Sequence, residues 1–463
     1  MKQLLFFLFL SLQLSAQDFL VKKGVVIDDL KVGDSLEESY SLYLPLAYEN
    51  GKQWPMLLIF DGEGRGKSAA HLFRLAAEEQ GYLLVSSNDI SDQNDLEENV
   101  MIASRLLQYV TAILPVDFQQ VSTSGSMTGA KVASSFPLIF DNIHGVVAVG
   151  DHWLNFNLLD ERKNFAFIGI VGDEQFSVAE MNHTADLLAR LKFPSQVYTY
   201  DGNEEWPSPE IINSAVASLS LDAMRKGKRP VDRQLIENLY QQDLARVNKL
   251  MSLNQLLNAE NLLDIMEEKY DDLIDNSQLR SQQDQLSRSR NYSLQKREQN
   301  EISQKESRLM DDFIYYMEDD IRSSNFENLG WWNYQKIQLD SLSQRNNAED
   351  KMAVRLKGFI KEYARLKRSA LKEDRTSSLE SKLLANMLHT IFDPQAFDAY
   401  KEIISLSAQD NDFQTAYFYL EEMLKHGFKD MQALYKIEGT LGLRLTPEYN
   451  SIIEKYLGTS KFH

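Results

Sequence analysis

The chain has 463 residues, of which 43% are apolar, so it is long enough to form two or three domains with their own cores. Its 68 acidic residues outnumber its 49 basic ones, which gives a formal charge of −19. We therefore expect no nucleic-acid partner and no anionic membrane partner, because phosphate groups are bound by clustered cations. The one dense basic run, residues 225–230, is short, and we interpret it as a solvated linker.

The first residues are typical of a secretory signal. A positively charged start precedes an apolar run over residues 4–14, and residues 15–17 supply the small side chains of a cleavage site. We expect a signal peptide over 1–17, and a mature chain from about Asp18 that is exported to the bacterial periplasm, the outer membrane or the outside of the cell. No stretch reaches the roughly 18 apolar residues of a membrane helix, so we expect no membrane span. The chain has no Cys, which excludes disulfide bonds and an acylated cysteine anchor.

From about residue 37 to 228, short β-rich runs alternate with helical stretches, a rhythm typical of a mostly parallel sheet covered by helices. Several runs are continuously apolar, as strands buried on both faces should be. The predicted strands are residues 40–46, 56–61, 82–87, 120–124, 144–150, 165–171 and 195–200. The predicted crossover helices include residues 67–79, 97–114 and 178–191. We therefore expect an α/β domain over 18–228.

After Pro230 the β pattern ends, and the remaining chain is predicted to be all-α. We expect a helical linker region over 229–275, a long polar helix or flexible arm over 276–310, and a helical domain over 311–463. The arm is rich in Gln, Ser, Arg and Glu and carries only a thin apolar stripe. It is therefore interpreted either as a long exposed helix or as a partly disordered segment.

Residues 411–428 resemble the second helix of a tetratricopeptide repeat, and residues 397–408 would be the first helix of that pair. Residues 431–439 and 447–457 are interpreted as a further, divergent helix pair. The residues that would pack the repeat and form its protein-contact helix are Ala416, Tyr417, Leu420 and Leu424. Stacked helical pairs form concave surfaces for protein partners, so we expect an envelope protein to bind the helical domain. The alternative is a plain helical domain without a ligand.

A strand that runs directly into a helix through two glycines marks the candidate active site. In the run 125–129 (Gly-Ser-Met-Thr-Gly), small residues stand where the backbone must turn sharply. Supporting matches are residues 41–45, 57–64, 76–82 and 202–207. In their order and spacing these motifs resemble the polyester-depolymerase and feruloyl-esterase-like branch of the α/β-hydrolases, over residues 40–227. The resemblance implies a nucleophilic serine in this turn, with an acid and a histidine on later loops.

All three triad positions that the resemblance implies hold residues unsuited to this chemistry. Met127 stands at the nucleophile position, and a thioether has no proton to give. Gln175 stands at the acid position, and a neutral amide cannot stabilise an imidazolium. Glu204 stands at the histidine position, where a solvated carboxylate with a pKa of about 4.3 is a far weaker base than imidazole. We therefore expect no intact catalytic site.

Other residues are candidates for taking over the chemistry or for binding a ligand. The candidates for a substitute catalytic apparatus are Ser126, Thr128, His152 and Asp173. The residues expected to line a vestigial pocket for a small ester or saccharide are Gly62, Gly125, Gly129 and Trp206. The seven histidines show no paired spacing, so we expect no metal site and no cofactor.

These patterns favour an exported pseudo-esterase that acts as a protein-binding or scaffolding component of the cell envelope. The alternative enzyme is a divergent secreted esterase or peptidase of the serine-hydrolase type, acting on acyl or carbohydrate esters. A binding module for carbohydrates or esters, without a protein partner, is a third hypothesis.

Overall fold

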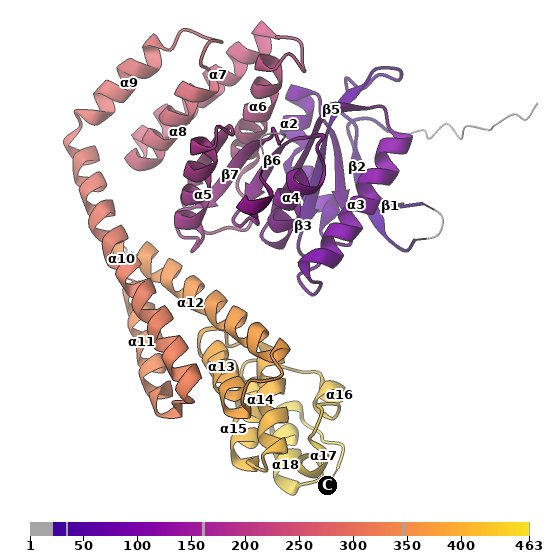
Figure 1. Ribbon diagram of the computed structural model, residues 1–463, viewed down its shortest axis with the longest axis vertical. Helices are drawn as coiled ribbons and strands as arrows, with labels where there is room; N and C mark the ends of the chain where they lie inside the picture. Colours follow the sequence, from indigo (N-terminus) through magenta and orange to yellow (C-terminus); the bar gives the residue numbers. More distant parts are fainter. Residues whose placement is uncertain (1–21, 34–35, 160–162, 345–347, 463) are drawn as a thin grey trace, which may run out of the picture. The chain divides into compact units, whose positions relative to one another are not determined.

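The computed structural model describes residues 22–33, 36–159, 163–344 and 348–462 (Figure 1). The signal peptide expected over 1–17 lies outside these residues. The chain divides into two compact units. The first comprises Met1–Ala148, His152–Ala166 and Ser208–Val231, and the second comprises Val149–Asp151, Phe167–Pro207 and Asp232–His463.

Eight strands form one sheet in the order β1-β2-β4-β3-β5-β6-β7-β8. The strands are β1 (Val26–Lys31), β2 (Ser39–Tyr43), β3 (Trp54–Asp61), β4 (Leu83–Ser87), β5 (Val116–Ser126), β6 (Ile143–Val149), β7 (Ala166–Gly172) and β8 (Ser195–Tyr200). β2 runs antiparallel to β1 and β4, whereas β3 is parallel to β4 and β5, and β7 is parallel to β8. The predicted fold class, a mostly parallel sheet followed by a helical region, is therefore confirmed.

The helices that accompany the strands are α1 (Gly66–Leu72), α2 (Arg74–Gln80), α3 (Leu96–Ile113), α4 (Thr128–Ile139), α5 (Val178–Arg190) and α6 (Pro209–Arg225), with the 3-10 helix η1 (Phe156–Leu158). The single helix predicted over 67–79 is wrong, because the structure has two helices there. They meet at Phe73, whose side chain is completely buried. Strand β1 was not predicted, since it is only partly buried and carries two adjacent aspartates instead of an alternating apolar pattern.

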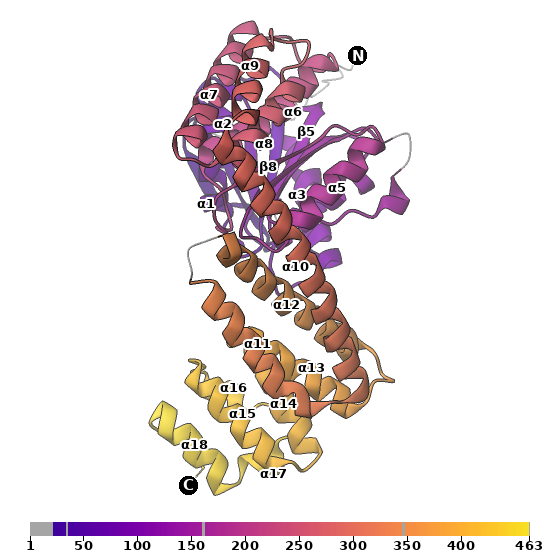
Figure 2. The same ribbon diagram turned by 90° about the vertical axis from the view of Figure 1, so that its left-hand side faces the viewer.

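The rest of the second unit is helical. Its helices are α7 (Arg233–Ser252), α8 (Leu256–Lys269), α9 (Ser277–Ser287), α10 (Arg290–Ser323), η2 (Phe326–Asn328), α11 (Leu329–Leu342), α12 (Ala348–Glu373), α13 (Leu379–Phe392), α14 (Phe397–Gln409), α15 (Phe413–Lys425), α16 (Met431–Leu434), α17 (Leu441–Arg444) and α18 (Pro447–Leu457). Apart from Asn276, Arg288 and Ser289, the polar arm over 276–310 is helical, and it comprises α9 and the first part of α10. α10 continues to Ser323 and packs along α12 (Figures 1 and 2). Among the described residues, no helix is both long and apolar enough to cross a membrane.

The segment that resembles a tetratricopeptide repeat forms the helix pair α14–α15. Ala416, Leu420 and Leu424 are buried in the core that this pair shares with α18, and the Tyr417 hydroxyl donates to Thr446 Oγ1 at 2.8 Å. These residues therefore hold the helices together, and a partner surface on α15 would need its exposed residues, such as Phe418. The assignment to the tetratricopeptide family stays a prediction.

Helix α8 packs on β8, the last strand of the sheet, and α7 packs on α8. The side chain of Asn261 on α8 donates to the Val197 carbonyl at 2.8 Å and accepts from the Thr199 amide at 3.0 Å. Asn261 thus satisfies backbone groups that the edge of a sheet would leave unpaired. Within the second unit, β8 and these two helices form one packed element.

A buried ion pair strengthens this element. Lys269 Nζ lies 2.8 Å from Asp243 Oδ2, and both side chains are almost completely buried. The Tyr270 hydroxyl donates to the same carboxylate oxygen at 2.8 Å. Burial alone would lower the pKa of Lys269, but Asp243 outweighs burial and raises it, so the lysine stays protonated in the interior.

We predict that Lys269→Met destabilises the protein by about 3–5 kcal/mol, because it leaves the Asp243 carboxylate buried without its cation. Urea unfolding measures this change. The control is Lys296→Met, which removes the partly exposed pair between Lys296 and Glu260 and should change stability by less than about 1 kcal/mol. Equal losses in the two variants would contradict the role of the buried pair.

A buried histidine makes the helical part sensitive to acid. His389 on α13 is 4% exposed, and neither ring nitrogen has a hydrogen-bond partner among the described residues. Burial, followed by the positive charge of Arg368, lowers the pKa of His389 to about 4. Between about pH 6.5 and pH 4 the unfolded chain therefore binds a proton that the folded chain does not, and stability falls as the pH falls.

We predict that His389→Leu makes stability less dependent on pH in this window, with the parent losing up to about 3 kcal/mol more than the variant. Urea unfolding at several pH values tests the difference. His183→Leu, which changes an exposed histidine, is the control and should retain the parent's pH dependence. His144, whose pKa burial also lowers to about 4, is unchanged in both variants. Parallel pH profiles for the parent and His389→Leu would contradict the prediction.

Candidate functional site

The turn between β5 and α4 has the backbone of a nucleophile elbow. Met127 is the single residue between the strand and the helix, and it has φ 51° and ψ −116°. Side chains of L-residues are rarely found in this left-handed region, and a strained strand-to-helix turn is the feature that exposes the nucleophile of an α/β-hydrolase. Met127, which the sequence resemblance assigns to the nucleophile position, thus lies at the centre of this turn, and its assignment as a former catalytic position stays a prediction.

Gly125 and Gly129 make this turn possible. The backbones of β3, β5 and α4 come so close together there that a side chain at either position would clash. A Cβ at Gly125 would lie 2.2 Å from the carbonyl oxygen of Gly129, and a Cβ at Gly129 would lie 2.1 Å from the carbonyl oxygen of Phe60 on β3. Gly62, which follows β3, is less constrained, since its Cβ would lie 2.2 Å from Asp92 Oδ1, the end of a side chain that can move. Gly125 and Gly129 are therefore needed for packing, whether or not they also line a ligand pocket.

The hydroxyl groups beside Met127 differ in their surroundings. Ser126 is the last residue of β5, pairs in register with Asp61 of β3 and is completely buried. A buried hydroxyl cannot attack a substrate that arrives from solvent, so Ser126 is a poor substitute nucleophile. Thr128 is partly buried at the start of α4, and His152 is 9% exposed in the first unit. A catalytic role for Thr128 or His152 stays a prediction.

Gln175, which the resemblance assigns to the acid position, connects two loops of the second unit. Gln175 lies in the turn after β7, where its Oε1 accepts from the Gly172 amide at 3.0 Å and its Nε2 donates to the Glu204 carbonyl at 3.0 Å. An aspartate could not make this bridge, because a carboxylate cannot donate a hydrogen bond to a carbonyl. Gln175 therefore ties the β7 turn to the loop after β8.

Glu204 contributes its backbone to this arrangement and leaves its side chain exposed. Its carbonyl also accepts from the Tyr200 hydroxyl, at 2.5 Å. The carboxylate folds back over Gly202, where a Cβ would lie 2.5 Å from Glu204 Oε2. Trp206, in the same loop, is partly buried.

Two cations of α12 hold the same loops. Lys351 donates to Asp173 Oδ2 at 2.7 Å and to the carboxylate of Asp201, and Asp173 Oδ1 also accepts from the Gly202 amide at 3.1 Å. Burial alone would lower the pKa of Lys351, but its bonds to Asp173 and Asp201 outweigh burial and raise it. Asp173 thus has both carboxylate oxygens committed to structural bonds, which makes it a poor partner for a catalytic histidine.

Arg355, one turn further along α12, completes this contact. Its guanidinium donates to the Asp173 carbonyl and forms two parallel bonds with the Glu306 carboxylate of α10, at 2.8 and 2.6 Å. Neither Lys351 nor Arg355 was expected from the sequence. The available signal was a charged residue within the apolar stripe of α12, since Arg355 follows Met352 by three residues and precedes Leu356.

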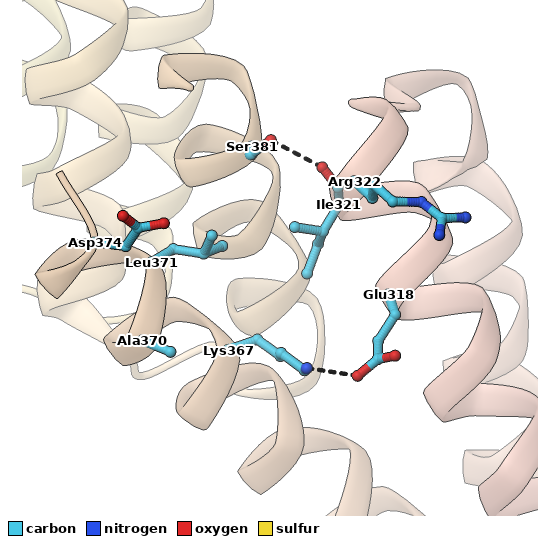
Figure 3. Close-up of a pocket in the computed structure, with 8 residues that line it drawn as sticks. All are labelled: Glu318, Ile321, Arg322, Lys367, Ala370, Leu371, Asp374 and Ser381. Carbon is cyan, nitrogen blue, oxygen red and sulfur yellow. Dashed lines mark hydrogen bonds and ion pairs between the residues drawn. The ribbon is translucent and has the colours of Figure 1, made fainter. Parts of the chain in front are cut away.

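A separate pocket of about 530 Å³ lies in the second unit (Figure 3). Its lining residues are Glu318, Ile321, Arg322, Lys367, Ala370, Leu371, Asp374 and Ser381. Figure 3 shows Lys367 joined to Glu318 and Ser381 bonded to the backbone of Ile321. Arg322 is paired with Asp319. The pocket has the volume of a ligand site, but these charges already have partners.

The described residues contain no group of three or more His, Asp or Glu side chains that could hold a metal ion. No protein-family model and no curated protein matches the chain. The mostly parallel sheet and the elbow at Met127 confirm the resemblance to α/β-hydrolases at the level of the fold.

The chain is similar to solved structures of esterases. Esterase 2 from Thermogutta terrifontis is 13% identical, with a TM-score of 0.35 over 46% of this chain and 98% of that chain. Est1E from Butyrivibrio proteoclasticus is 12% identical, with a TM-score of 0.33 over 43% and 99% of the two chains. The feruloyl esterase module from Clostridium thermocellum is 15% identical, with a TM-score of 0.31 over 39% and 82%.

The left-handed backbone at Met127 should affect the stability of variants at this position, whether or not the site is catalytic. Met127→Gly should be more stable than Met127→Ala by about 1 kcal/mol, because glycine adopts this conformation without steric strain. Thermal unfolding of the two variants checks the difference. Met101 on the exposed side of α3 is the control, since there the glycine variant should be the less stable by about 1 kcal/mol. The same order of stability at both positions would contradict a strained turn.

Proposed function

We propose that this chain is a catalytically inactive protein of α/β-hydrolase fold that works by binding a protein partner in the bacterial cell envelope. The observation that carries the proposal is Met127 in the conformation of the elbow residue. The turn is formed, but the side chain at its centre has no proton that a base could remove, so it cannot form an acyl-enzyme.

The loops after β7 and β8 support the same proposal. Gln175 and the Glu204 carbonyl bond to each other, while Asp173 bonds to α12. An active hydrolase would use these loops to orient a histidine by a carboxylate. Here the groups at the corresponding positions support the packing of the second unit.

Two further features support export to the cell envelope and binding of a protein partner. Export is supported by the apolar run over residues 4–14, which follows a positively charged start. Binding of a partner is supported by the extent of the helical region, which carries large exposed aromatic side chains. A small ester or saccharide in the vestigial pocket is a further ligand compatible with this proposal.

A reconstruction of the triad tests the proposal. The parent should hydrolyse chromogenic acyl esters no faster than buffer, whereas the triple variant Met127→Ser, Gln175→Asp, Glu204→His should show turnover above the parent. The matched control carries Met127→Ala with the same two other changes and should stay inactive, because it lacks the nucleophile.

Turnover by the parent would refute the proposal. If that turnover disappeared when Thr128 or His152 was replaced, the divergent esterase would take its place. An inactive triple variant beside an inactive parent would count against the assignment of the triad positions, and the parent's inactivity would still agree with the proposal.

A further inference from the structure

Helices α10 and α11 of the second unit carry large aromatic side chains on their exposed surface. Tyr315 and Tyr316 on α10 are 63% and 43% exposed, and Tyr334 on α11 is 56% exposed. The partly buried Trp331 connects the two helices, with its ring centroid 5.2 Å from that of Tyr316. We name Tyr315, Tyr316, Trp331 and Tyr334 the aromatic surface.

This surface is anchored to the core below it. Trp331 contacts the next residue, Trp332, edge to face with centroids 4.9 Å apart. Trp332 is completely buried, and its indole donates to Asp320 Oδ2 at 2.8 Å. The aromatic surface therefore rests on a rigid base, which reduces the entropy lost when a partner docks.

Carboxylates lie one helical turn from Tyr315, Tyr316 and Trp331. Asp311 and Asp312 are exposed one helical turn before Tyr315 and Tyr316, and Asp319 follows one turn after Tyr315. Glu327 is exposed one turn before Trp331, in the residues that lead into α11. The nearby cations Arg322 and Lys367 pair with Asp319 and Glu318.

The aromatic rings and the carboxylates together favour a positively charged partner. The faces of Tyr and Trp rings attract cations, and guanidinium groups in particular stack on them. The carboxylates attract the same groups and repel anions, in agreement with the formal charge of −19 of the whole chain. A neutral partner would use the rings but gain nothing from the carboxylates.

We propose that the aromatic surface binds an arginine- or lysine-bearing segment of a protein partner. This inference rests on the proposed function, to which it adds the chemistry of the partner. The cationic side chains lie over the rings of Tyr315, Tyr316 and Tyr334, and their charges meet Asp311, Asp312 and Glu327. Arginine binds more tightly than lysine, because its planar guanidinium stacks on the rings.

The test measures binding of short synthetic peptides to the full chain by calorimetry. One peptide contains arginines, and its counterpart contains citrulline, which has the same shape without the charge. The parent should bind the arginine peptide at least about tenfold more tightly than the citrulline peptide, a difference of about 1.4 kcal/mol. The preference should weaken as salt increases.

Substitutions in the aromatic surface test whether the arginine peptide binds there. The triple variant Tyr315→Ala, Tyr316→Ala, Tyr334→Ala should bind the arginine peptide at least about tenfold more weakly. Asp311→Asn with Asp312→Asn should weaken it less and reduce its salt dependence. The control is Phe418→Ala, which removes an exposed aromatic residue of α15 and should leave binding unchanged. Circular dichroism verifies that each variant keeps its helices.

Failure to bind the arginine peptide, equal binding of the citrulline peptide, or undiminished binding by the triple tyrosine variant would each overturn the inference. So would tighter binding of a neutral oligosaccharide at these tyrosines, which would make the surface a sugar platform. The outcome is independent of the esterase assay. A parent with esterase activity that still bound the arginine peptide would refute the inactive-hydrolase proposal and leave this surface in place.

Discussion

The bonds of Asp173 join two loops of the sheet to a helix within the second unit. One carboxylate oxygen accepts from the Gly202 amide, the other accepts from Lys351 of α12, and the carbonyl accepts from Arg355. One residue thus fixes the β7 turn, the β8 loop and α12 against one another. Loss of the Asp173 side chain would remove two of these bonds, whereas Lys351 would keep its bond to Asp201 and Arg355 its bonds to Glu306.

The elbow shows that a catalytic backbone and a catalytic side chain are separate properties. The turn at Met127 is imposed by the close approach of β3, β5 and α4, which Gly125 and Gly129 permit. Its strain, of the order of 1–3 kcal/mol, is sustained by this packing and requires no reaction. The geometry of this turn is therefore independent of the reactivity of its central residue, and the chemistry of residue 127 decides whether the site can react.

The sequence predicted what depends on local patterns. Buried parallel strands and the elbow glycines follow from apolar runs and from Gly spacing, and the helix predicted over 447–457 has the bounds of α18. Strand β1 was not predicted, because its two adjacent aspartates interrupt the alternation of apolar and polar residues that is typical of a strand. Lys351 and Arg355 were missed for another reason: Lys351 lies 178 residues from Asp173, and no local pattern reports which loop a distant helix will contact.

The contacts of the β7 and β8 loops agree with the proposed binding function. Many enzymes adjust loops around the substrate during turnover, and that movement requires contacts weak enough to exchange. Gln175 and Asp173 instead join the β7 and β8 loops to each other and to α12 by several hydrogen bonds and ion pairs. A binding protein gains from such rigidity, since a surface that is already ordered loses less entropy when its partner docks. These contacts therefore agree with the proposed role as a binding protein, and Arg355 extends them to α10, the helix that carries Tyr315 and Tyr316.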